Sequence, residues 1–309
     1  MVPAFGDGAL LRETVHSVLR QDDPGWRLTV IDDGVAAGRA GDLGSWLAGL
    51  GDARVRYLPN PRRLGINRNF QRCADEASAE LVVILGCDDR LFPDFVGRVR
   101  AVATQFPDAA FVHTGAAVIG ADGRPVHPLA DRVKRLSAPP VQAHRVMGGE
   151  ELAASLLHGN WMYFPSVAFR RAVLQRHGFR PGYDIVLDLD LYLRILLAGG
   201  RAVLLEQPGV EYRRHGASLS SAQATDGSRF AEELAYFVEA AALAAAAGWP
   251  RAARAARWHW TSRLHTVAKV PALLAGGHPR TAAALLRTAV AARPGRAAGD
   301  PAAGDPSTA

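Results

Sequence analysis

Two pairs of adjacent aspartates each follow a short apolar run. Asp32-Asp33 comes directly after residues 28–31, and Asp88-Asp89 comes shortly after residues 81–85. Carboxylate oxygens are the ligands that a hard cation such as Mg²⁺ or Mn²⁺ prefers, and such a cation keeps its affinity for substrate phosphates. The alternative is structural, because an aspartate after a strand is also typical of a turn or of a helix N-cap. The residue types alone leave both interpretations open.

A third group of charged residues lies further along the chain. Asp190 and Arg194 are four residues apart in a predicted helix, which indicates an ion pair and a structural role for Asp190. Asp188 stands at the start of the same helix, where the helix dipole stabilises a carboxylate. A basic segment, residues 213–215, ends at His215. It predicts either a solvated turn or a contact to phosphate.

The elements that must position these residues alternate between strands and helices. Strands are expected over 28–31, 54–58, 81–85, 109–112, 116–119 and 202–205, and helices over 9–20, 39–50, 66–77, 92–104, 149–158, 167–177 and 187–198, with a long loop over 125–146. This alternation is typical of an α/β protein with a doubly wound, mostly parallel sheet. In such sheets ligands bind beyond the carboxyl ends of the strands, and both aspartate pairs lie there.

Length and composition bound the domain organisation. The 309 residues are 49% hydrophobic and 21% charged, which allows a sizeable core in one large domain or two modest ones. Beyond residue 222 the sequence becomes rich in Ala and Arg, with helices expected over 228–247, 250–270 and 279–292. We therefore expect a core domain over residues 1–222, a helical extension over 223–293 and a disordered tail over 294–309.

The positive charge belongs to the C-terminal segment. Residues 240–299 contain nine Lys and Arg and no Asp or Glu, so with a net charge of +6 the rest of the chain carries −3. A basic helix beside Trp258 and Trp260 could lie on an anionic membrane surface. The alternative, slightly favoured, is a helical cap on the core or a dimer contact. Nucleic acid is not expected as a partner, because no recognised binding motif is present.

The sequence also bears on location. No stretch reaches the roughly 18 apolar residues of a membrane span, and the N-terminus shows no signal peptide. The two cysteines, Cys73 and Cys87, exclude a disulfide framework and suit a reducing compartment. We therefore expect a cytoplasmic protein, with peripheral contact to the inner membrane surface left open.

The order of these motifs along the chain resembles a known family. The motifs are Val2–Phe5, Val30–Gly34, Asn60, Leu64–Asn69, Leu85–Asp89, Asp188–Arg194 and Tyr212–His215. Together, over about residues 2–220, they resemble the family 2 glycosyltransferases, which are inverting enzymes of the nucleotide-diphospho-sugar transferase (GT-A) fold. The resemblance implies that fold for this chain, with the helical extension added at the C-terminus.

The resemblance implies roles for individual residues. The nucleotide-binding residues would be Pro3, Ala4, Phe5, Asp32, Asp33, Asn67 and Asp88. Asp88 would face the ribose or the diphosphate. Asp89 would hold the metal, and His215 would contact the metal or the diphosphate. Asp188 would be the catalytic base.

The implied reaction moves a sugar from a nucleoside-diphosphate sugar to an acceptor hydroxyl. UDP is the expected donor nucleotide, with dTDP or GDP as alternatives, and Mg²⁺ or Mn²⁺ would assist. The acceptor would be a carbohydrate, a lipid-linked molecule or a small molecule, as in cell-surface polysaccharide or natural-product glycosylation. A carboxylate that removes the acceptor proton opposite the leaving diphosphate would give inversion.

The sequence departs from the family's pattern at three places. The apolar strand before the Val2–Phe5 segment is nearly absent, Gly86 stands where the metal motif usually has an acid, and Leu187 stands where Glu often precedes the catalytic Asp. These departures leave open a second function, a catalytically degenerate nucleotide-sugar-binding or scaffold protein of the same fold. A nucleotidyltransferase is discounted, because no glycine-rich loop with a basic residue follows the first strand.

Overall fold

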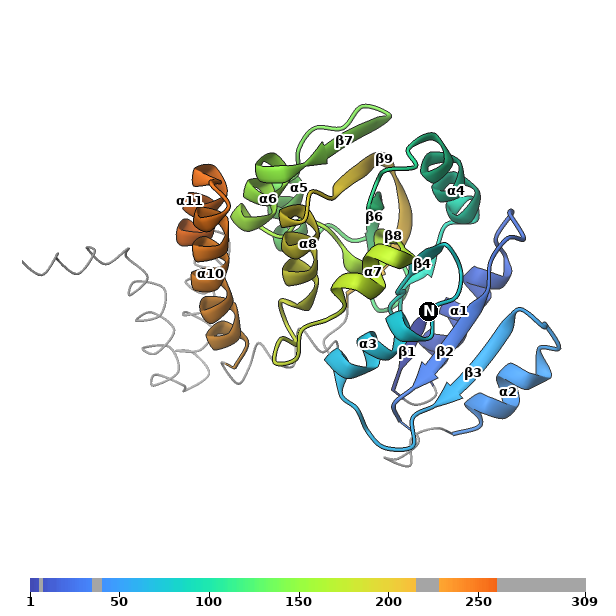
Figure 1. Cartoon of the computed structure of the whole chain (residues 1–309). Coiled ribbons are helices and arrows are strands. Elements are labelled where there is room, and N and C mark those ends of the chain that lie inside the picture. The colour runs from blue at the N-terminus through green and yellow to red at the C-terminus, as the bar shows by residue number, and fades with distance from the viewer. Residues whose placement is uncertain (6–7, 35–40, 215–227, 260–309) are drawn as a thin grey trace, which may run out of the picture.

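Three parallel strands form one end of the sheet in the computed structural model, which describes residues 1–5, 8–34, 41–214 and 228–259 (Figure 1). They are β1 (Val2–Ala4), β2 (Leu28–Asp32) and β3 (Val55–Pro59), in the order β1–β2–β3. Helices α1 (Ala9–Leu19) and α2 (Leu43–Gly49) fall between them in the chain. Every residue of β2 is buried, as expected for a central strand covered on both faces.

The first strand, β1, is short, as the sequence predicts, but it is present. All three residues of β1 pair with β2 in parallel. Met1 continues the sheet on the other side: its amine donates to the carbonyl of Val83 at 2.8 Å, and its carbonyl accepts from the N–H of Leu85 at 2.9 Å. These bonds join the first three strands to β4 (Leu81–Val83), so Asp32-Asp33 and Asp88-Asp89 follow strands of one continuous surface.

The second half of the sheet is mixed in direction. Its strands are β4, β5 (Arg90–Leu91), β6 (Phe111–Ile119), β7 (His144–Gly148), β8 (Val167–Arg170) and β9 (Arg201–Arg213), in the order β4–β8–β6–β9–β5 with β7 also on β9. Strands β6 and β9 are parallel, whereas β8, β5 and β7 pair antiparallel with their neighbours. The predicted α/β architecture is confirmed, and the antiparallel pairs are confined to this half.

Several predicted boundaries are wrong. Residues 167–170 were expected to be helical but form β8, and only α7 (Arg171–His177) is helix. The expected loop over 125–146 contains α5 (Leu129–Ser137) and the start of β7. The two short strands predicted over 109–112 and 116–119 are one strand, β6, with an irregularity at Gly115. Short apolar runs do not distinguish strand from helix, because either element can bury them.

The main core lies between the second half of the sheet and the helices α6 (Gly149–His158) and α8 (Leu187–Leu197). Tyr192 of α8 packs on Phe169 of β8, with ring centroids 6.1 Å apart, and on Phe111 of β6, at 5.6 Å. The remaining helices of this region are α3 (Ile66–Asp75), α4 (Phe95–Gln105) and a short 3₁₀ helix, η2 (Phe164–Ser166). The packing fixes α8, and with it the position of Asp188 in its first turn.

Two C-terminal helices share this core. Helices α10 (Ser228–Ala246) and α11 (Pro250–Trp258) bury small side chains such as Ala244 and Ala252, and α11 packs on α6 (Figure 1). Alanines allow close approach of the helix backbones. The predicted helix over 250–270 is described only through residue 259, and those expected beyond it lie outside the described residues. Among the described helices, none has the length and apolar character needed to cross a membrane.

Candidate active site

The carboxyl ends of β1, β2 and β3 meet at Asp33. Its backbone N–H donates to the carbonyl of Ala4, and the N–H of Asn60 donates to the carbonyl of Asp32, both at 2.8 Å. The Asp33 carboxylate accepts three hydrogen bonds: from the Asn60 amide at 2.7 Å, from the N–H of Leu64 at 2.6 Å and from the N–H of Gly65 at 2.9 Å. Asp33 therefore fixes the loop between β3 and α3.

Asp32 and Asn67 are also held by the protein. The fully buried Asp32 accepts the Tyr57 hydroxyl at 2.9 Å and the N–H of Gly34 at 2.7 Å. Burial and the Asp32 partner raise the pKa of Tyr57 to about 12, so the phenol stays a donor. The Asn67 amide donates to two backbone carbonyls in the segment before α8, those of Arg180 and Tyr183. Its nitrogen is therefore committed within the protein.

The residues predicted to line the base pocket lie at the end of β1. Pro3 and Ala4 pair with β2, and Ala4 is buried. The Phe5 ring is 41% exposed, and the guanidinium of Arg63 lies over it, 4.7 Å from the ring centroid. An exposed ring at the end of a parallel strand suits stacking with a flat ligand.

Asp88 and Asp89 converge over Gly86. A Cβ built on Gly86 would overlap Oδ2 of Asp89 and lie 3.2 Å from Oδ1 of Asp88. The missing side chain at position 86 therefore leaves the space that these two carboxylates occupy. Oδ1 of Asp89 accepts the backbone N–H of Arg213 at 2.8 Å. Neither aspartate is the N-cap of α4, which is Asp94, so the capping interpretation is wrong.

The electrostatics of this pair favour a cation. Burial, and secondly the Asp88 carboxylate, raise the pKa of Asp89 to about 8, although the Arg213 N–H opposes the rise. One oxygen of Asp88 and one of Asp89 converge on the same space, and the Asp89 carboxyl resists ionisation. A divalent ion bound there would stabilise the charged form of Asp89. Among the residues that the structure describes, no cluster of three or more His, Cys, Asp or Glu side chains forms. His215 lies outside the described residues.

Arg213 is buried and joins three segments by hydrogen bonds, so it is not part of a solvated turn. Its guanidinium donates to the carbonyl of Asp88 at 2.8 Å, to the carbonyl of Ala121 at 3.0 Å and to Glu13 of α1 at 2.6 Å. Only 2% of this residue is exposed. It therefore ties the end of β9 to the Asp88-Asp89 turn, and it is not available to a phosphate.

The neighbouring Arg214 belongs to a cluster that the sequence did not predict. It forms a two-point ion pair with Asp131 of α5, at 2.7 and 3.1 Å. The Tyr163 hydroxyl also donates to Asp131, at 2.5 Å, and its ring lies 4.8 Å from that of Tyr212. Burial alone would raise the pKa of Asp131, but the hydrogen bonds from Arg214 and Tyr163 lower it. Burial raises the pKa of Tyr212 to about 12. The charge of Arg214 opposes this rise, and the charges of Asp89 and Asp88 add to it.

Asp188 lies in the first turn of α8. Asn160 donates to its Oδ2 at 2.8 Å, and the N–H of Leu189 donates to Oδ1 at 2.7 Å. Burial raises the pKa of Asp188, against the lowering effects of these hydrogen bonds and of Lys134 on α5. A carboxylate with a raised pKa is suited to accepting a proton near neutral pH.

Helix α10 supports the segment that leads into Asp188. Glu232 accepts the N–H groups of Ile185 and Val186, at 2.6 and 3.0 Å. Glu239 accepts the Tyr183 hydroxyl at 2.5 Å and pairs with Arg180 at 2.7 Å. The C-terminal helices therefore take part in positioning α8.

Asp190 has the structural role that its spacing predicts. It is buried, pairs with Arg194 at 2.8 Å and pairs with Arg180 at 2.6 Å. Asp188 and Asp190 are only two residues apart, yet one is held by an amide and the other by two guanidiniums. The two ion pairs neutralise the charge of Asp190, whereas no ion pair neutralises that of Asp188 among the described residues.

Comparison with known sequences identifies the family. The sequence model described as Glycosyl transferase family 2 matches residues 1–177. The chain belongs to glycosyl transferase family 2. A relative from Mycobacterium tuberculosis, the uncharacterized protein MT1568, is 28% identical over 71% of this chain and 67% of its own length. TuaG of Bacillus subtilis, named as a teichuronic acid biosynthesis glycosyltransferase, is 22% identical over 72% of this chain and 80% of its own length.

Solved structures confirm the GT-A fold. Staphylococcus aureus TarS 1–349 in complex with UDP-GlcNAc superimposes with a TM-score of 0.59 at 15% identity, covering 77% of this chain and 64% of TarS. GalNAc-T7 with UDP, GalNAc and Mn²⁺ superimposes with a TM-score of 0.51 at 16% identity, covering 69% of this chain and 43% of that one. This family 2 chain thus spans less than two thirds of either structure.

In this family 2 chain the predicted acids lie along one edge of the sheet, in two groups. Asp32 and Asp33 end β2, whereas Asp88 and Asp89 follow β4, which Met1 joins to β1. Asp188 belongs to α8, where Asn160 donates a hydrogen bond to it and the charge of Lys134 on α5 lowers its pKa. Within the described residues, no hydrogen bond joins Asp33, Asp89 and Asp188 to one another.

A hollow of about 490 Å³ lies beside α5. Asp131, Lys134 and Tyr163 line it, together with Trp161 and the buried His113. Burial lowers the pKa of His113 to about 3, so this imidazole is neutral. None of Asp33, Asp89 and Asp188 is among its lining residues. The sequence prediction missed Asp131 and Lys134 because it made their segment a loop, although Leu129, Val133 and Leu136 show a helical spacing.

Proposed function

We propose that this family 2 protein transfers a sugar from a nucleoside-diphosphate sugar to an acceptor hydroxyl with inversion. The observation that carries the proposal is the convergence of Asp88 and Asp89 over Gly86, together with a separate half-buried carboxylate, Asp188, whose pKa is raised. Asp88 and Asp89 suit a cation that neutralises the leaving diphosphate, and Asp188 suits the removal of a proton from the incoming hydroxyl. UDP is the first donor nucleotide to test, because the TarS and GalNAc-T7 structures contain UDP-GlcNAc and UDP; dTDP and GDP follow.

The chain's own residues divide the work. Asp188 accepts the proton of the acceptor hydroxyl as the oxygen bonds to the anomeric carbon, and the bond from that carbon to the diphosphate breaks. Phe5 stacks on the base, with Pro3, Ala4 and the Asp33 loop shaping the pocket. Asp32 and Asn67 support that loop and α3 through the bonds that they already make.

A divalent cation is part of the proposal. Mg²⁺ or Mn²⁺ would be held by Asp89 and Asp88, with His215 as a further candidate ligand. When bound, it supplies positive charge that stabilises the leaving diphosphate. GalNAc-T7, whose structure contains Mn²⁺, shares the fold. The convergence of the Asp88 and Asp89 carboxylates over Gly86 supports this assignment.

The catalytic unit is proposed to comprise residues 1–222, with the helices of 223–293 attached. The acceptor is a carbohydrate, a lipid-linked molecule or a small molecule with a nucleophilic hydroxyl. The hollow beside α5 is proposed as the acceptor site, since Lys134 both lines it and acts on Asp188.

Nucleotide binding by the full chain tests the proposal. Isothermal titration with UDP should show binding that Mn²⁺ strengthens, and Asp89→Asn should remove the metal effect. The exposed Asp122→Asn serves as the matched control. Screening UDP-, dTDP- and GDP-sugars for nucleoside-diphosphate release then identifies the donor. Nucleotide binding without release from any donor would favour the degenerate scaffold, and absence of nucleotide binding would overturn both functions.

A further inference from the structure

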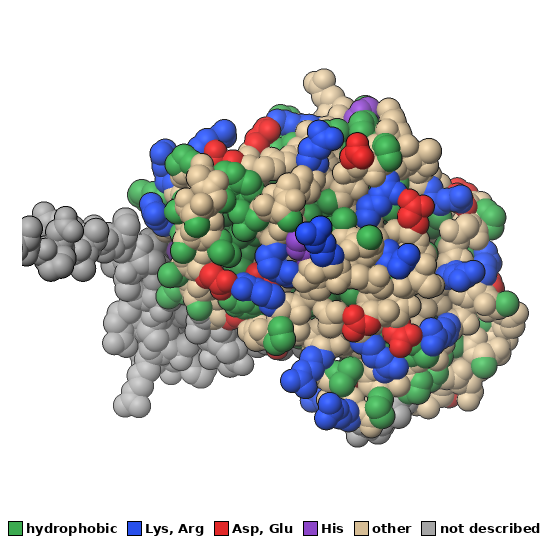
Figure 2. All heavy atoms as spheres, in the orientation of Figure 1, with side chains coloured by type: hydrophobic (Ala, Val, Ile, Leu, Met, Phe, Trp, Pro, Cys, Tyr) green, Lys and Arg blue, Asp and Glu red, His purple; other side chains and the backbone are tan. Residues whose placement is uncertain are grey.

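The exposed face of α11 is cationic. Its alanines Ala252 and Ala256 are buried against the core, whereas Arg251 and Arg254 face outward with Trp258, which is 62% exposed. These three outward residues are spaced i, i+3 and i+7, so they share one face of the helix. Figure 2 shows blue side chains at the end of the molecule where α11 lies.

Helix α5 exposes leucines instead of burying them. Leu129 and Leu136 are 74% and 86% exposed and lie two turns apart, with the exposed Arg132 and Arg135 between them. The opposite face of α5 holds the buried Asp131. A helix that turns its arginines and leucines outward together resembles the helices that lie in the interfacial layer of a membrane. An isolated exposed leucine would need no explanation, but two on one basic helix face do.

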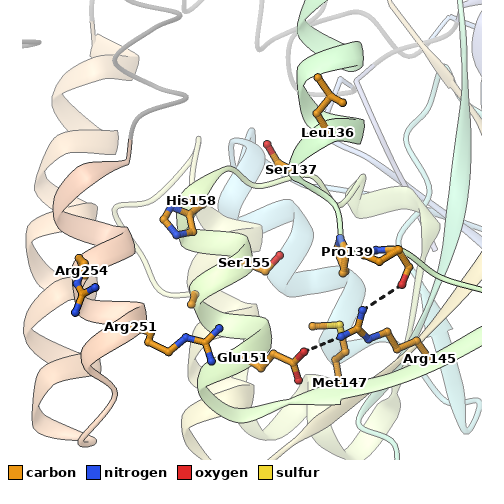
Figure 3. A pocket seen from close by; sticks show the side chains of 12 residues that line it. Leu136, Ser137, Pro139, Arg145, Met147, Glu151, Ser155, His158, Arg251 and Arg254 are labelled. Carbon is orange, nitrogen blue, oxygen red and sulfur yellow. Dashed lines mark hydrogen bonds and ion pairs between the residues drawn. The ribbon is translucent and has the colours of Figure 1, made fainter.

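A basic pocket of about 710 Å³ lies between the two helices. Leu136 and Ser137 line it from α5, Arg251 and Arg254 from α11, and Arg145 from β7 (Figure 3). Glu151 of α6 is its acidic lining residue and is already paired with Arg145 at 2.7 Å. In Figure 3 Arg251 extends from α11 toward Glu151. Three guanidiniums facing one carboxylate leave an excess of positive charge.

We propose that the face formed by the outward residues of α5 and α11 binds an anionic membrane surface, with one lipid phosphate in the pocket between Arg145, Arg251 and Arg254. Guanidiniums hold phosphate oxygens through paired hydrogen bonds. Leu129, Leu136 and Trp258 insert at the level of the headgroups. The exposed leucines favour a lipid surface over a nucleic acid, whose backbone offers charge without an apolar layer. The proposal does not depend on the sugar-transfer function.

Co-sedimentation of the full chain with vesicles tests this proposal. Vesicles of equimolar phosphatidylcholine and phosphatidylglycerol should pellet the protein, and vesicles of phosphatidylcholine alone should not. Salt at about 1 M should weaken the binding, since the Debye length falls to about 3 Å. Equal binding to both vesicles, or binding to single-stranded or duplex DNA that the anionic vesicles do not displace, would overturn it.

Paired variants locate the surface. Arg251→Gln with Arg254→Gln should lower the partition coefficient by roughly 10-fold or more, because each basic residue near an anionic surface contributes about 1 kcal/mol. The control replaces two exposed arginines elsewhere, Arg20→Gln with Arg27→Gln, and should retain most of the binding. Leu129→Ser with Leu136→Ser should weaken binding even at low salt.

The thermal unfolding midpoint of each variant is measured alongside the partition coefficient. Arg251, Arg254, Leu129 and Leu136 are exposed, so these substitutions should leave the midpoint near that of the wild type. A folded Arg251/Arg254 variant that binds anionic vesicles as tightly as the control variant contradicts the proposal. UDP titration of the same variants reports on the sugar-transfer function separately.

Discussion

The two acidic regions of the sheet edge treat their carboxylates in opposite ways. At the β1–β2–β3 edge, Asp32 and Asp33 are saturated with hydrogen bonds from backbone N–H groups, a phenol and an amide. At the β4–β9 edge, formed by the turn after β4 and the end of β9, Asp89 accepts the N–H of Arg213 and crowds against Asp88. The carboxylates of the first region are satisfied by donors within the protein, whereas the second region contains a carboxyl group whose charged form a bound cation would stabilise.

This contrast indicates which acids support the site and which react. A carboxylate with three donors in a buried network mainly sets the shape of a loop. A carboxylate whose pKa is raised, such as the buried Asp89 or the half-buried Asp188, is suited to binding a cation or accepting a proton. Substitutions at the first edge should therefore change the free energy of unfolding, and substitutions at the second should change turnover.

The largest expected effect is at Asp188. Asp188→Asn should lower kcat by about 10²- to 10⁴-fold, because an amide cannot accept the acceptor proton. The affinity for UDP, measured by titration calorimetry, should stay close to that of the wild type. The exposed Asp184→Asn, in the segment before α8, is the control and should retain kcat. Full turnover by Asp188→Asn would mean that another group is the base.

Substitution of Asp33 should lower the stability of the fold. Asp33→Ala should lower the free energy of unfolding by about 3 kcal/mol, since it removes the acceptor of three hydrogen bonds, from the buried Asn60 amide and from the half-buried N–H groups of Leu64 and Gly65. Urea denaturation monitored by tryptophan fluorescence measures this loss. Asp108→Ala, at an exposed position, should change it by less than about 0.5 kcal/mol. An unchanged stability would remove the distinction between the two edges.

Gly86 probes the space shared by Asp88 and Asp89. Gly86→Ala places a Cβ against the Asp89 carboxylate and should reduce Mn²⁺-dependent turnover roughly 10-fold or more, as the displacement of a ligand does. The unfolding midpoint should change little, because flexible carboxylates can move aside. Gly49→Ala, with open space around its Cβ, is the matched control. Undiminished Mn²⁺ response in Gly86→Ala would argue against a cation on this pair.

The smallest expected effect concerns pH. The Asn160 hydrogen bond stabilises the charged form of Asp188 and so lowers its pKa. Asn160→Ala removes this bond, raises the pKa and should move the acid limb of the kcat/KM profile upward by roughly 0.5–1 pH unit. Turnover of the wild type should fall as pH drops through the raised pKa of Asp188, since the base must be unprotonated. A limb that moves downward would show that Asn160 stabilises the neutral form.

The sequence predicts the first half of the fold better than the second. Strand β2 is a mostly apolar run that ends at an aspartate pair, and this pattern is local. Two segments of the second half are predicted wrongly, for different reasons. Residues 129–137 carry a local helical spacing that the prediction of a loop overlooked. Residues 167–170 form β8 because they pair with β4 and β6, which are distant in the sequence. Periodicity within a short window does not contain those partners.

The sequence by itself determined the family, the order of the elements from α1 to β4, the aspartate pairs at strand ends and the ion pair of Asp190 with Arg194. Each of these follows from residue spacing along the chain. Only the tertiary structure decided that Arg213 is buried and bonded to the Asp88-Asp89 turn, and that Asp131 pairs with Arg214. It also decided that the Asp33 carboxylate accepts three hydrogen bonds, whereas Asp89 accepts the N–H of Arg213 and has a raised pKa. Burial and hydrogen bonding between distant segments set these differences, because two neighbouring aspartates look alike until the surrounding donors are in place.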